Sequence, residues 1–261
     1  MDWIAHCRQQ VIEAFERLTV KGLLHSPGAE FSVRVPGQAA MAVAHLSCSQ
    51  SGQNLTAART RGQDTSATRG EAPAPRARRE TPALGARPEI RVVVFEAAAP
   101  PPLLDAPMLW LHAEVYRHRP DVGGILISPL PWGSRLASLG GTVPAVFDEQ
   151  VRHLGPRVER LVLQGTGMAK SAIPILKRGA NAFLIERGVL CLGPTGARAV
   201  LNAELLEKCA QAFILASLAR RPVRVIPSYV RLIATLRLRK DEKRASRAYA
   251  RGESPDRLMA Y

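Results

Sequence analysis

Residues 111–140 read LHAEVYRHRPDVGGILISPLPWGSRLASLG, and this stretch indicates the class of fold. The pattern predicts a helix over 107–118 that ends before Arg119-Pro120, because the residue ahead of a proline disfavours helical backbone. The apolar run GILIS at 124–128 predicts a short buried strand, and residues 132–139 predict a second helix. Helix, turn, strand and helix in close succession are typical of a domain in which helices pack on a sheet.

The sequence on both sides continues this mixture of strands and helices. We expect an amphipathic first helix with Ile4, Val11, Ile12, Phe15 and Leu18 near helical spacing. FSVRVP (31–36), IRVVVFEA (90–97) and NAFLIERGVLCLG (181–193) are strand-like, and residues 140–155 form a proline-containing connection. A long helix is expected over 197–218 and a last one over 229–245, apolar at Val230, Ile233 and Leu236. Together these elements predict an α/β or α+β layered domain.

Two segments differ in composition from the rest of the chain. Residues 49–90 are rich in Ser, Thr, Gly, Pro, Ala and Arg and contain almost no large apolar side chains. Such a segment buries too little surface to offset its ordering entropy, so we expect a disordered insertion within one domain, 1–236. Residues 237–261 are expected to form a basic C-terminal tail.

The net charge of +14 is concentrated in these parts of the chain. Residues 49–90 hold seven arginines and four acids, and residues 220–261 hold twelve Lys or Arg and four acids. The remaining body is close to neutral, which argues against a nucleic-acid-binding body. No apolar run approaches the roughly 20 residues that span a bilayer. We expect a cytoplasmic protein without a membrane partner, whose four separated cysteines are buried, reduced thiols.

Three blocks resemble the class II aldolase/adducin family, in that family's order. GLLHSPGAEFSVRV (22–35) is similar to its glycine-rich phosphate-binding turn. Residues 111–137 are similar to its helix–RPD–strand segment, and residues 181–213 to its strand ending in His-Gly with the helix that follows. The resemblance covers about residues 8–220. It implies a three-layer α-β-α domain around a central mixed, mostly antiparallel sheet.

In that family three histidines and a nearby acidic residue hold a zinc ion, which polarises a carbonyl and stabilises an enediolate. By position these ligands fall on Ile127, Pro129, Arg187 and Met108. Isoleucine and proline have no side-chain lone pair, and an arginine opposes a cation. In the phosphate-binding turn, Ala29-Glu30 replaces Gly-Asn, and Ala106-Pro107 replaces a Ser-Ser pair. The resemblance therefore implies a divergent member that lacks zinc, and no catalytic residue is assigned.

Three functions remain open. The first is an oligomeric binding or scaffold module, as in the adducin head domain, forming a homo-oligomer such as the family's tetramers. A small anionic ligand would then bind at Ser32, Arg34, Ser128 and Arg187, with the Arg187 guanidinium in place of the metal. In the simpler alternative, Arg187 pairs with Glu186 or Glu30. The second function is an active aldolase or epimerase on a sugar phosphate that uses a non-standard site. The third is nucleic-acid or acidic-surface binding through the insertion and the tail.

Overall fold

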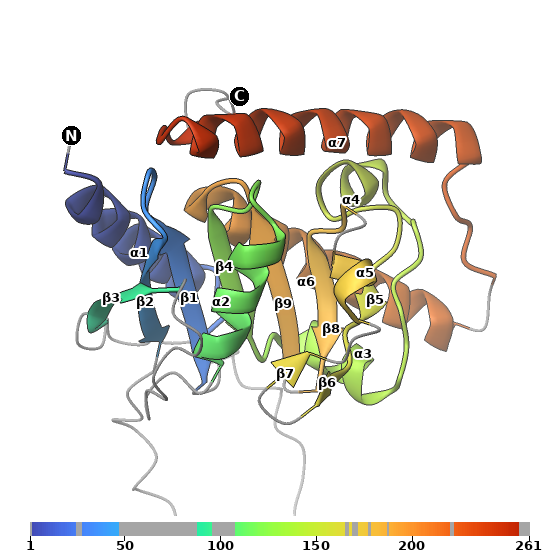
Figure 1. Ribbon diagram of the computed structural model, residues 1–261. Helices are drawn as coiled ribbons and strands as arrows, with labels where there is room; N and C mark the ends of the chain where they lie inside the picture. The colour runs from blue at the N-terminus through green and yellow to red at the C-terminus, as the bar shows by residue number, and fades with distance from the viewer. Residues whose placement is uncertain are drawn as a thin grey trace, which may run out of the picture.

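The central sheet has seven strands in the order β3-β2-β1-β4-β9-β8-β5 (Figure 1). The computed structural model describes residues 2–24, 28–46, 88–95, 108–164, 167–168, 172–176, 179–186, 188–219 and 222–255. The strands are β1 Ala29–Arg34, β2 Ala40–Leu46, β3 Ile90–Val94, β4 Gly124–Ser128, β5 Glu159–Arg160, β8 Ala182–Ile185 and β9 Gly188–Gly193. Neighbouring strands are antiparallel except β5 and β8, which are parallel. The expected mixed, mostly antiparallel sheet is confirmed. A separate two-stranded ladder joins β6 (Leu163–Gln164) and β7 (Gly167–Met168).

Helices cover both faces of this sheet. Two hydrophobic clusters form, one beneath α1 (Trp3–Val20), α3 (Pro131–Ser138) and α6 (Gly196–Leu218), the other beneath α2 (Leu109–His118) and α5 (Ala172–Leu176). All five residues of β4 are buried, because both of its faces are covered, and its sequence is accordingly a continuous apolar run. The short helix α4 (Asp148–His153) packs against the long helix α7 (Ser228–Ala250), which crosses one end of the sheet (Figure 1). The three expected layers are present.

The stretch NAFLIERGVLCLG is two strands and not one. The chain reverses between Ile185 and Gly188, and β8 pairs antiparallel with β9. Gly188 has φ of 141°, a conformation that favours glycine, and a Cβ there would lie 2.4 Å from the Ser128 carbonyl oxygen. The elements not predicted from the sequence include strand β2 and helix α4.

The boundary expected at residue 237 has no counterpart in the structure, because α7 runs through it without interruption. The residues beyond it pack on the domain: Ala245 and Ala248 are buried, and the Tyr249 hydroxyl donates to the Pro194 carbonyl oxygen at 2.9 Å. The small side chains of Ala245 and Ala248 let this highly charged part of α7 pack closely on the domain, and the composition of the segment does not reveal this. Ile233 and Leu236, in contrast, are exposed.

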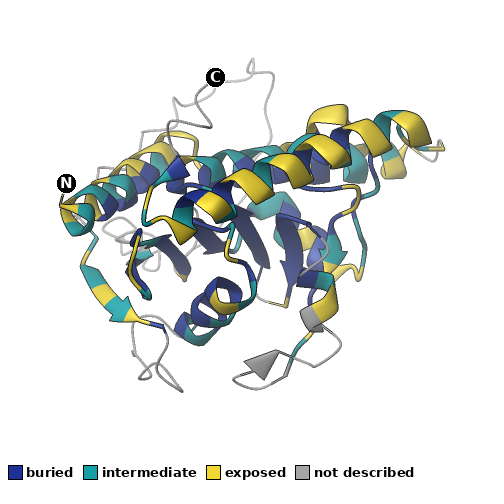
Figure 2. Cartoon of the chain, turned by 45° about the horizontal axis from the view of Figure 1, so that its top comes forward, coloured by how far each residue is buried: buried dark blue, intermediate teal, exposed yellow. Residues whose placement is uncertain are grey.

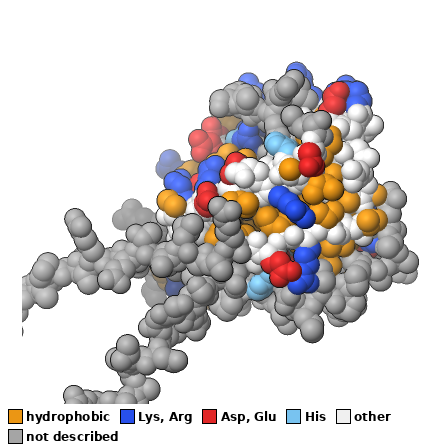
Figure 3. Space-filling view, turned by 90° about the vertical axis from the view of Figure 1, so that its left-hand side faces the viewer, with side chains coloured by type: hydrophobic (Ala, Val, Ile, Leu, Met, Phe, Trp, Pro, Cys, Tyr) orange, Lys and Arg blue, Asp and Glu red, His pale blue; other side chains and the backbone are white. Residues whose placement is uncertain are grey.

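The expected insertion falls almost wholly on residues 47–87, outside the described residues. The end of that stretch is described, and Ile90 opens β3 at the edge of the sheet. Val92 and Val94 of this edge strand are exposed. Figure 3 faces this side of the molecule and shows hydrophobic side chains interspersed with charged ones.

Candidate functional site

Three polar side chains of β1 contact successive parts of α2. Glu30, Ser32 and Arg34 alternate along the strand with Phe31 and Val33, so they share the face on which α2 packs. Glu30 accepts the Met108 N–H at 2.9 Å, where α2 begins. Arg34 donates to the Tyr116 carbonyl oxygen at 2.7 Å, near its end. Four residues of strand, at a rise of roughly 3.3 Å each, span about the same length as nine residues of helix, at a rise of about 1.5 Å each. The strand and the helix are therefore fastened together along the whole length of α2.

The groups at the two ends of α2 suit the polarity of the helix. The Glu30 carboxyl group accepts a hydrogen bond at the amino end, and the Arg34 guanidinium, a cation, lies at the carboxyl end, where the helix dipole favours positive charge. Arg34 also donates to the carbonyl oxygens of Arg119 at 3.1 Å and Val122 at 2.8 Å. Its guanidinium lies 4.8 Å from the centre of the Tyr116 ring, with the Phe95 and Tyr249 rings slightly farther away. Arg34 thus donates to a carbonyl oxygen in the last turn of α2 and to two in the segment that follows it.

Between these ends lies a buried chain of hydrogen bonds. The Ser32 hydroxyl is 2.7 Å from His112 Nδ1 and 3.0 Å from the Tyr116 hydroxyl. His112 and Tyr116 are one helical turn apart, so both side chains reach the same point on β1. Burial raises the pKa of Tyr116, which therefore stays protonated.

Glu30 lies at the end of this series of hydrogen bonds, next to His112, but the two side chains are slightly too far apart for a hydrogen bond. Glu30 Oε2 lies 3.6 Å from His112 Nε2, and neither atom has a hydrogen-bond partner among the described residues. Burial raises the pKa of Glu30 to about 7, although the Met108 N–H opposes this, and burial lowers the pKa of His112 to about 3. Both groups therefore favour their neutral forms, a protonated carboxyl group beside a neutral imidazole.

The order Glu30, His112, Ser32 is that of a catalytic triad, but the site is closed. Ser32 and His112 have no solvent-exposed surface, and the Ser32 oxygen is held between two side chains. A nucleophile must reach its substrate, so this serine does not serve as one. The cluster is a polar core that joins β1 to α2.

A second polar cluster surrounds the RPD sequence at the other end of α2. The buried Arg119 guanidinium makes a two-point contact with Asp121 and donates to Asn181 Oδ1 at 2.9 Å and Glu242 at 3.1 Å. It also donates to the carbonyl oxygens of Leu176 and Ala180. Arg119 therefore joins α2, the start of β8 and α7.

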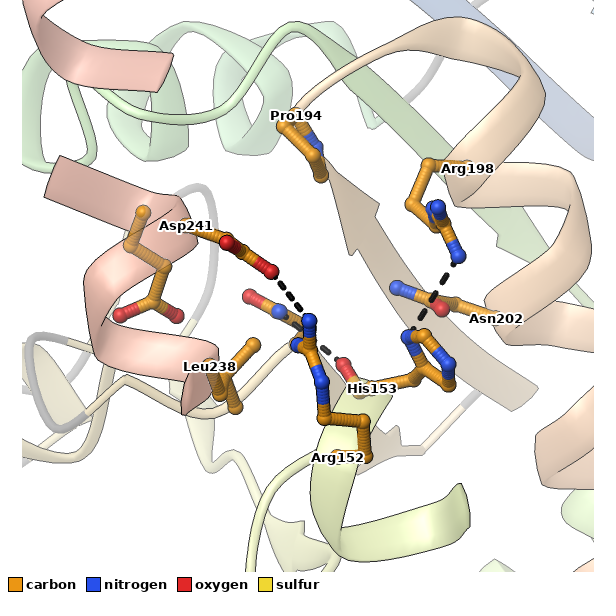
Figure 4. Close-up of a pocket in the computed structure, with 9 residues that line it drawn as sticks. Arg152, His153, Pro194, Arg198, Asn202, Leu238 and Asp241 are labelled. Carbon is orange, nitrogen blue, oxygen red and sulfur yellow. Dashed lines mark hydrogen bonds and ion pairs between the residues drawn. The ribbon is translucent and has the colours of Figure 1, made fainter. Parts of the chain in front are cut away.

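A small cavity lies beside this cluster, between α4, α6 and α7 (Figure 4). Arg152 pairs with Asp241, and Arg198 lies 3.5 Å from His153 Nδ1. Burial and the two neighbouring arginines lower the pKa of His153 to about 4. The cavity measures about 30 Å³, room for roughly two water molecules. It is too small for a sugar phosphate.

Comparison with known proteins relates part of the chain to a described family. Residues 104–214 match the sequence profile described as "Class II Aldolase and Adducin N-terminal domain". This segment of the chain is therefore similar to the class II aldolase/adducin family. No curated protein sequence matches it.

Several solved structures share the fold of this chain. An L-fuculose 1-phosphate aldolase superposes with a TM-score of 0.64 at 16% identity, over 90% of this chain and 96% of the other. The L-fuculose 1-phosphate aldolase from Glaciozyma antarctica PI12 gives 0.60 at 15% identity, over 95% and 89%. An aldolase II superfamily protein from Pseudomonas syringae gives 0.58 at 14% identity, over 97% and 94%. At such identities the likeness shows the fold alone.

The residues at the family's metal positions do not suit a metal ion. Ile127 is buried in the apolar cluster under α2, in register with Glu30 on one side and Leu190 on the other. Pro129 follows β4, and Met108 precedes α2. Arg187 lies outside the described residues. Within the part of the chain that the structure describes, no three His, Cys, Asp or Glu side chains are grouped to hold a cation. This donor set does not fit zinc.

The four residues predicted to bind an anion do not form one pocket in the described structure. Ser32 and Arg34 lie together under α2, but both are engaged with that helix. Ser128 pairs in register with Val189, which belongs to the cluster on the opposite face of the sheet. The fourth, Arg187, is not described.

Sequence reasoning missed Glu30, His112 and Tyr116 as one cluster. The signal was present: polar residues alternate with apolar ones along β1, and His112 and Tyr116 have helical spacing.

Proposed function

We propose that this class II aldolase/adducin family member is a binding or assembly module and not a zinc-dependent lyase. The observation that carries this proposal is the apolar filling at the family's metal position. Ile127 is buried together with Leu190 and Ile185, where a metal site requires lone pairs and an open coordination position for substrate.

The state of the phosphate-turn residues supports the same proposal. Glu30 places a carboxyl group where the resemblance puts a phosphate-binding turn, and that group is bonded to the Met108 N–H. Ser32 and Arg34 are likewise bonded within the chain. A sugar phosphate would have to displace these contacts to bind. The proposal includes self-association into a homo-oligomer, a tetramer by likeness to the family, in the cytoplasm.

Metal analysis of the purified full-length protein, grown with added zinc, tests the proposal. We expect substoichiometric zinc, manganese and iron, and no cleavage of L-fuculose 1-phosphate. Light scattering measures the oligomer mass in the same sample. Stoichiometric metal, or cleavage that a chelator abolishes, would refute the proposal.

A restored variant provides the positive control. It combines Met108→Glu, Ile127→His, Pro129→His and Arg187→His, which returns the family's four ligands. If this variant gains zinc while the natural chain does not, the substituted residues explain the difference. If both stay empty while the natural chain cleaves the substrate, a different catalytic site exists and the proposal fails.

A further inference from the structure

One side of α7 carries a continuous stripe of exposed large side chains. The stripe comprises Tyr229, Leu232, Ile233, Leu236, Lys240, Lys243, Arg244 and Arg247. The four apolar members are 50–66% exposed. Each basic member lies eleven residues after an apolar one, about three helical turns, so all eight share one side of the helix.

The acidic residues of α7 point away from this stripe. Asp241 pairs with Arg152 of α4, and Glu242 pairs with Arg119 beneath the helix. Arg244 lies 3.8 Å from Asp241 at the border of the stripe. The helix therefore separates its charges, with carboxylates toward the domain and cations toward solvent.

The stripe lies opposite the surface by which α7 packs. The buried residues of the helix are Ala234, Leu238, Ala245 and Ala248. Figure 1 shows α7 across the outside of the molecule, and Figure 2 shows exposed residues along its outer side. Because 23 residues of helix extend about 35 Å, this side is a long, convex ridge.

We propose that this stripe docks on the surface of an anionic phospholipid bilayer. Tyrosine, leucine and isoleucine side chains enter the boundary between headgroups and acyl chains, and the lysines and arginines contact lipid phosphates and carboxylates. A ridge that presents both kinds of side chain in one direction suits a flat surface that offers both environments.

Other occupants suit the stripe less well. A nucleic acid would neutralise the four cations but offers little to Leu232, Ile233 and Leu236, and Tyr229 alone provides a stacking ring. A second copy of the chain would cover the apolar half, but a stable interface needs roughly 800 Å² from each partner. Four half-exposed side chains fall short of that, and the cationic half gains no opposite charge from an identical ridge.

Docking of this kind requires no spanning segment. Among the described residues, no helix has both the length and the apolarity to cross a membrane. The expectation that the chain has no membrane partner rested on the absence of such a segment, and it does not bear on contact at the surface.

Co-sedimentation of the full-length protein with vesicles tests the proposal. The vesicles contain phosphatidylcholine, with or without phosphatidylserine. We expect binding to the mixed vesicles at low salt, weaker binding at high salt, and little binding to phosphatidylcholine alone. The variant Lys240→Glu/Lys243→Glu should lower the apparent affinity at least about tenfold. Leu232→Gln/Leu236→Gln should lower it by a similar factor while leaving the salt dependence in place.

Matched controls separate the stripe from the rest of this basic protein. Lys21→Glu/Lys208→Glu changes the net charge by the same amount at exposed sites outside α7, and Leu139→Gln/Leu218→Gln removes two leucines that are more exposed than those of the stripe. These controls should bind like the natural chain. Equal loss in controls and stripe variants overturns the proposal, as does absence of binding to mixed vesicles. Binding to duplex DNA that the stripe variants abolish would assign the stripe to nucleic acid. Self-association lost in the leucine variant would assign it to a second copy.

Discussion

The buried pair Glu30 and His112 makes a prediction about how stability depends on pH. In the folded chain Glu30 has a pKa of about 7 and His112 of about 3, against ordinary values of 4.5 and 6.5. Between about pH 4.5 and 6.5 the folded pair therefore holds one proton, on Glu30. The unfolded pair also holds one proton, on His112. Because the proton count is equal, the pair contributes no slope to the free energy of unfolding in this window.

When one partner is substituted, the pH dependence that the other contributes to the free energy of unfolding is no longer cancelled. Glu30 has a raised pKa, so its contribution to stability falls as pH rises from 4.5 towards 7. His112 has a lowered pKa, so its contribution is lost as pH falls from 6.5 towards 3. Relative to the natural chain, Glu30→Gln should therefore gain stability with rising pH, and His112→Gln should lose it. Each slope approaches about 1.4 kcal/mol per pH unit, or roughly 2 kcal/mol over one and a half units.

Urea unfolding at a series of pH values between 5 and 6.5, at constant ionic strength, measures these slopes. Glu242 and His153 titrate in all variants alike and cancel in the comparison. The double variant Glu30→Gln/His112→Gln should run parallel to the natural chain. Burial is the first cause of both shifts, so each should persist when the partner is gone. The reasoning is refuted if the free energy of unfolding of both single variants, relative to the natural chain, changes with pH in the same direction. It is also refuted if neither changes with pH.

Three further outcomes follow from the same contacts. Arg34→Met should lower the free energy of unfolding by about 3 kcal/mol or more, because it leaves buried carbonyl oxygens without a donor; denaturant titration measures this. Gly188→Ala should cost about 2 kcal/mol or more in the same assay, because φ is positive and the added carbon meets the Ser128 carbonyl oxygen. Ending the chain at residue 236 should lower the melting temperature and speed proteolysis, because Arg119 loses its ion pair with Glu242. A truncated chain as stable as the full one would support an independent tail.

The hydrophobic pattern was sufficient to predict an element where the residues of each of its faces share one kind of surroundings. The apolar run of β4 and the spacing in α1 and α6 are visible without any knowledge of partners, and these elements were predicted. Strand β2 was missed because Ala40–Leu46 is rich in alanine, which has low strand propensity, and pairing on both sides makes it a strand. Helix α4 is six residues long, and Gln150 anchors it by bonding Val146 N–H and the Pro144 carbonyl oxygen. Neither strand pairing nor such bonds between a side chain and the nearby backbone leaves a periodic signal.

The candidate site shows a different limit. The sequence shows which residues replace a family's ligands, but the structure shows which atoms the replacements contact. In the sequence, Ala29-Glu30 stands where the resemblance puts the Gly-Asn of a phosphate-binding turn, which indicates only a loss. In the structure the Glu30 carboxyl group accepts a hydrogen bond from the N–H of Met108, the residue that precedes α2. An acceptor within the chain therefore occupies the place where the resemblance puts a bound phosphate.

The presence of Glu30 in place of Asn links the loss of phosphate binding to the gain of an internal hydrogen-bond acceptor at the start of α2. A helix start that accepts an external phosphate gains stability when that ligand is bound. A helix start that is bonded to an acceptor within the chain does not depend on a ligand for that contact, but the ligand can then no longer bind at the same place. Ser32 and Arg34 likewise form hydrogen bonds with α2, with His112 and with the Tyr116 carbonyl oxygen. A variant with Glu30→Asn, which restores the family's residue at this position, separates the two properties. It should lower stability in buffer, and phosphate should recover part of that loss only if the remaining turn still binds anions.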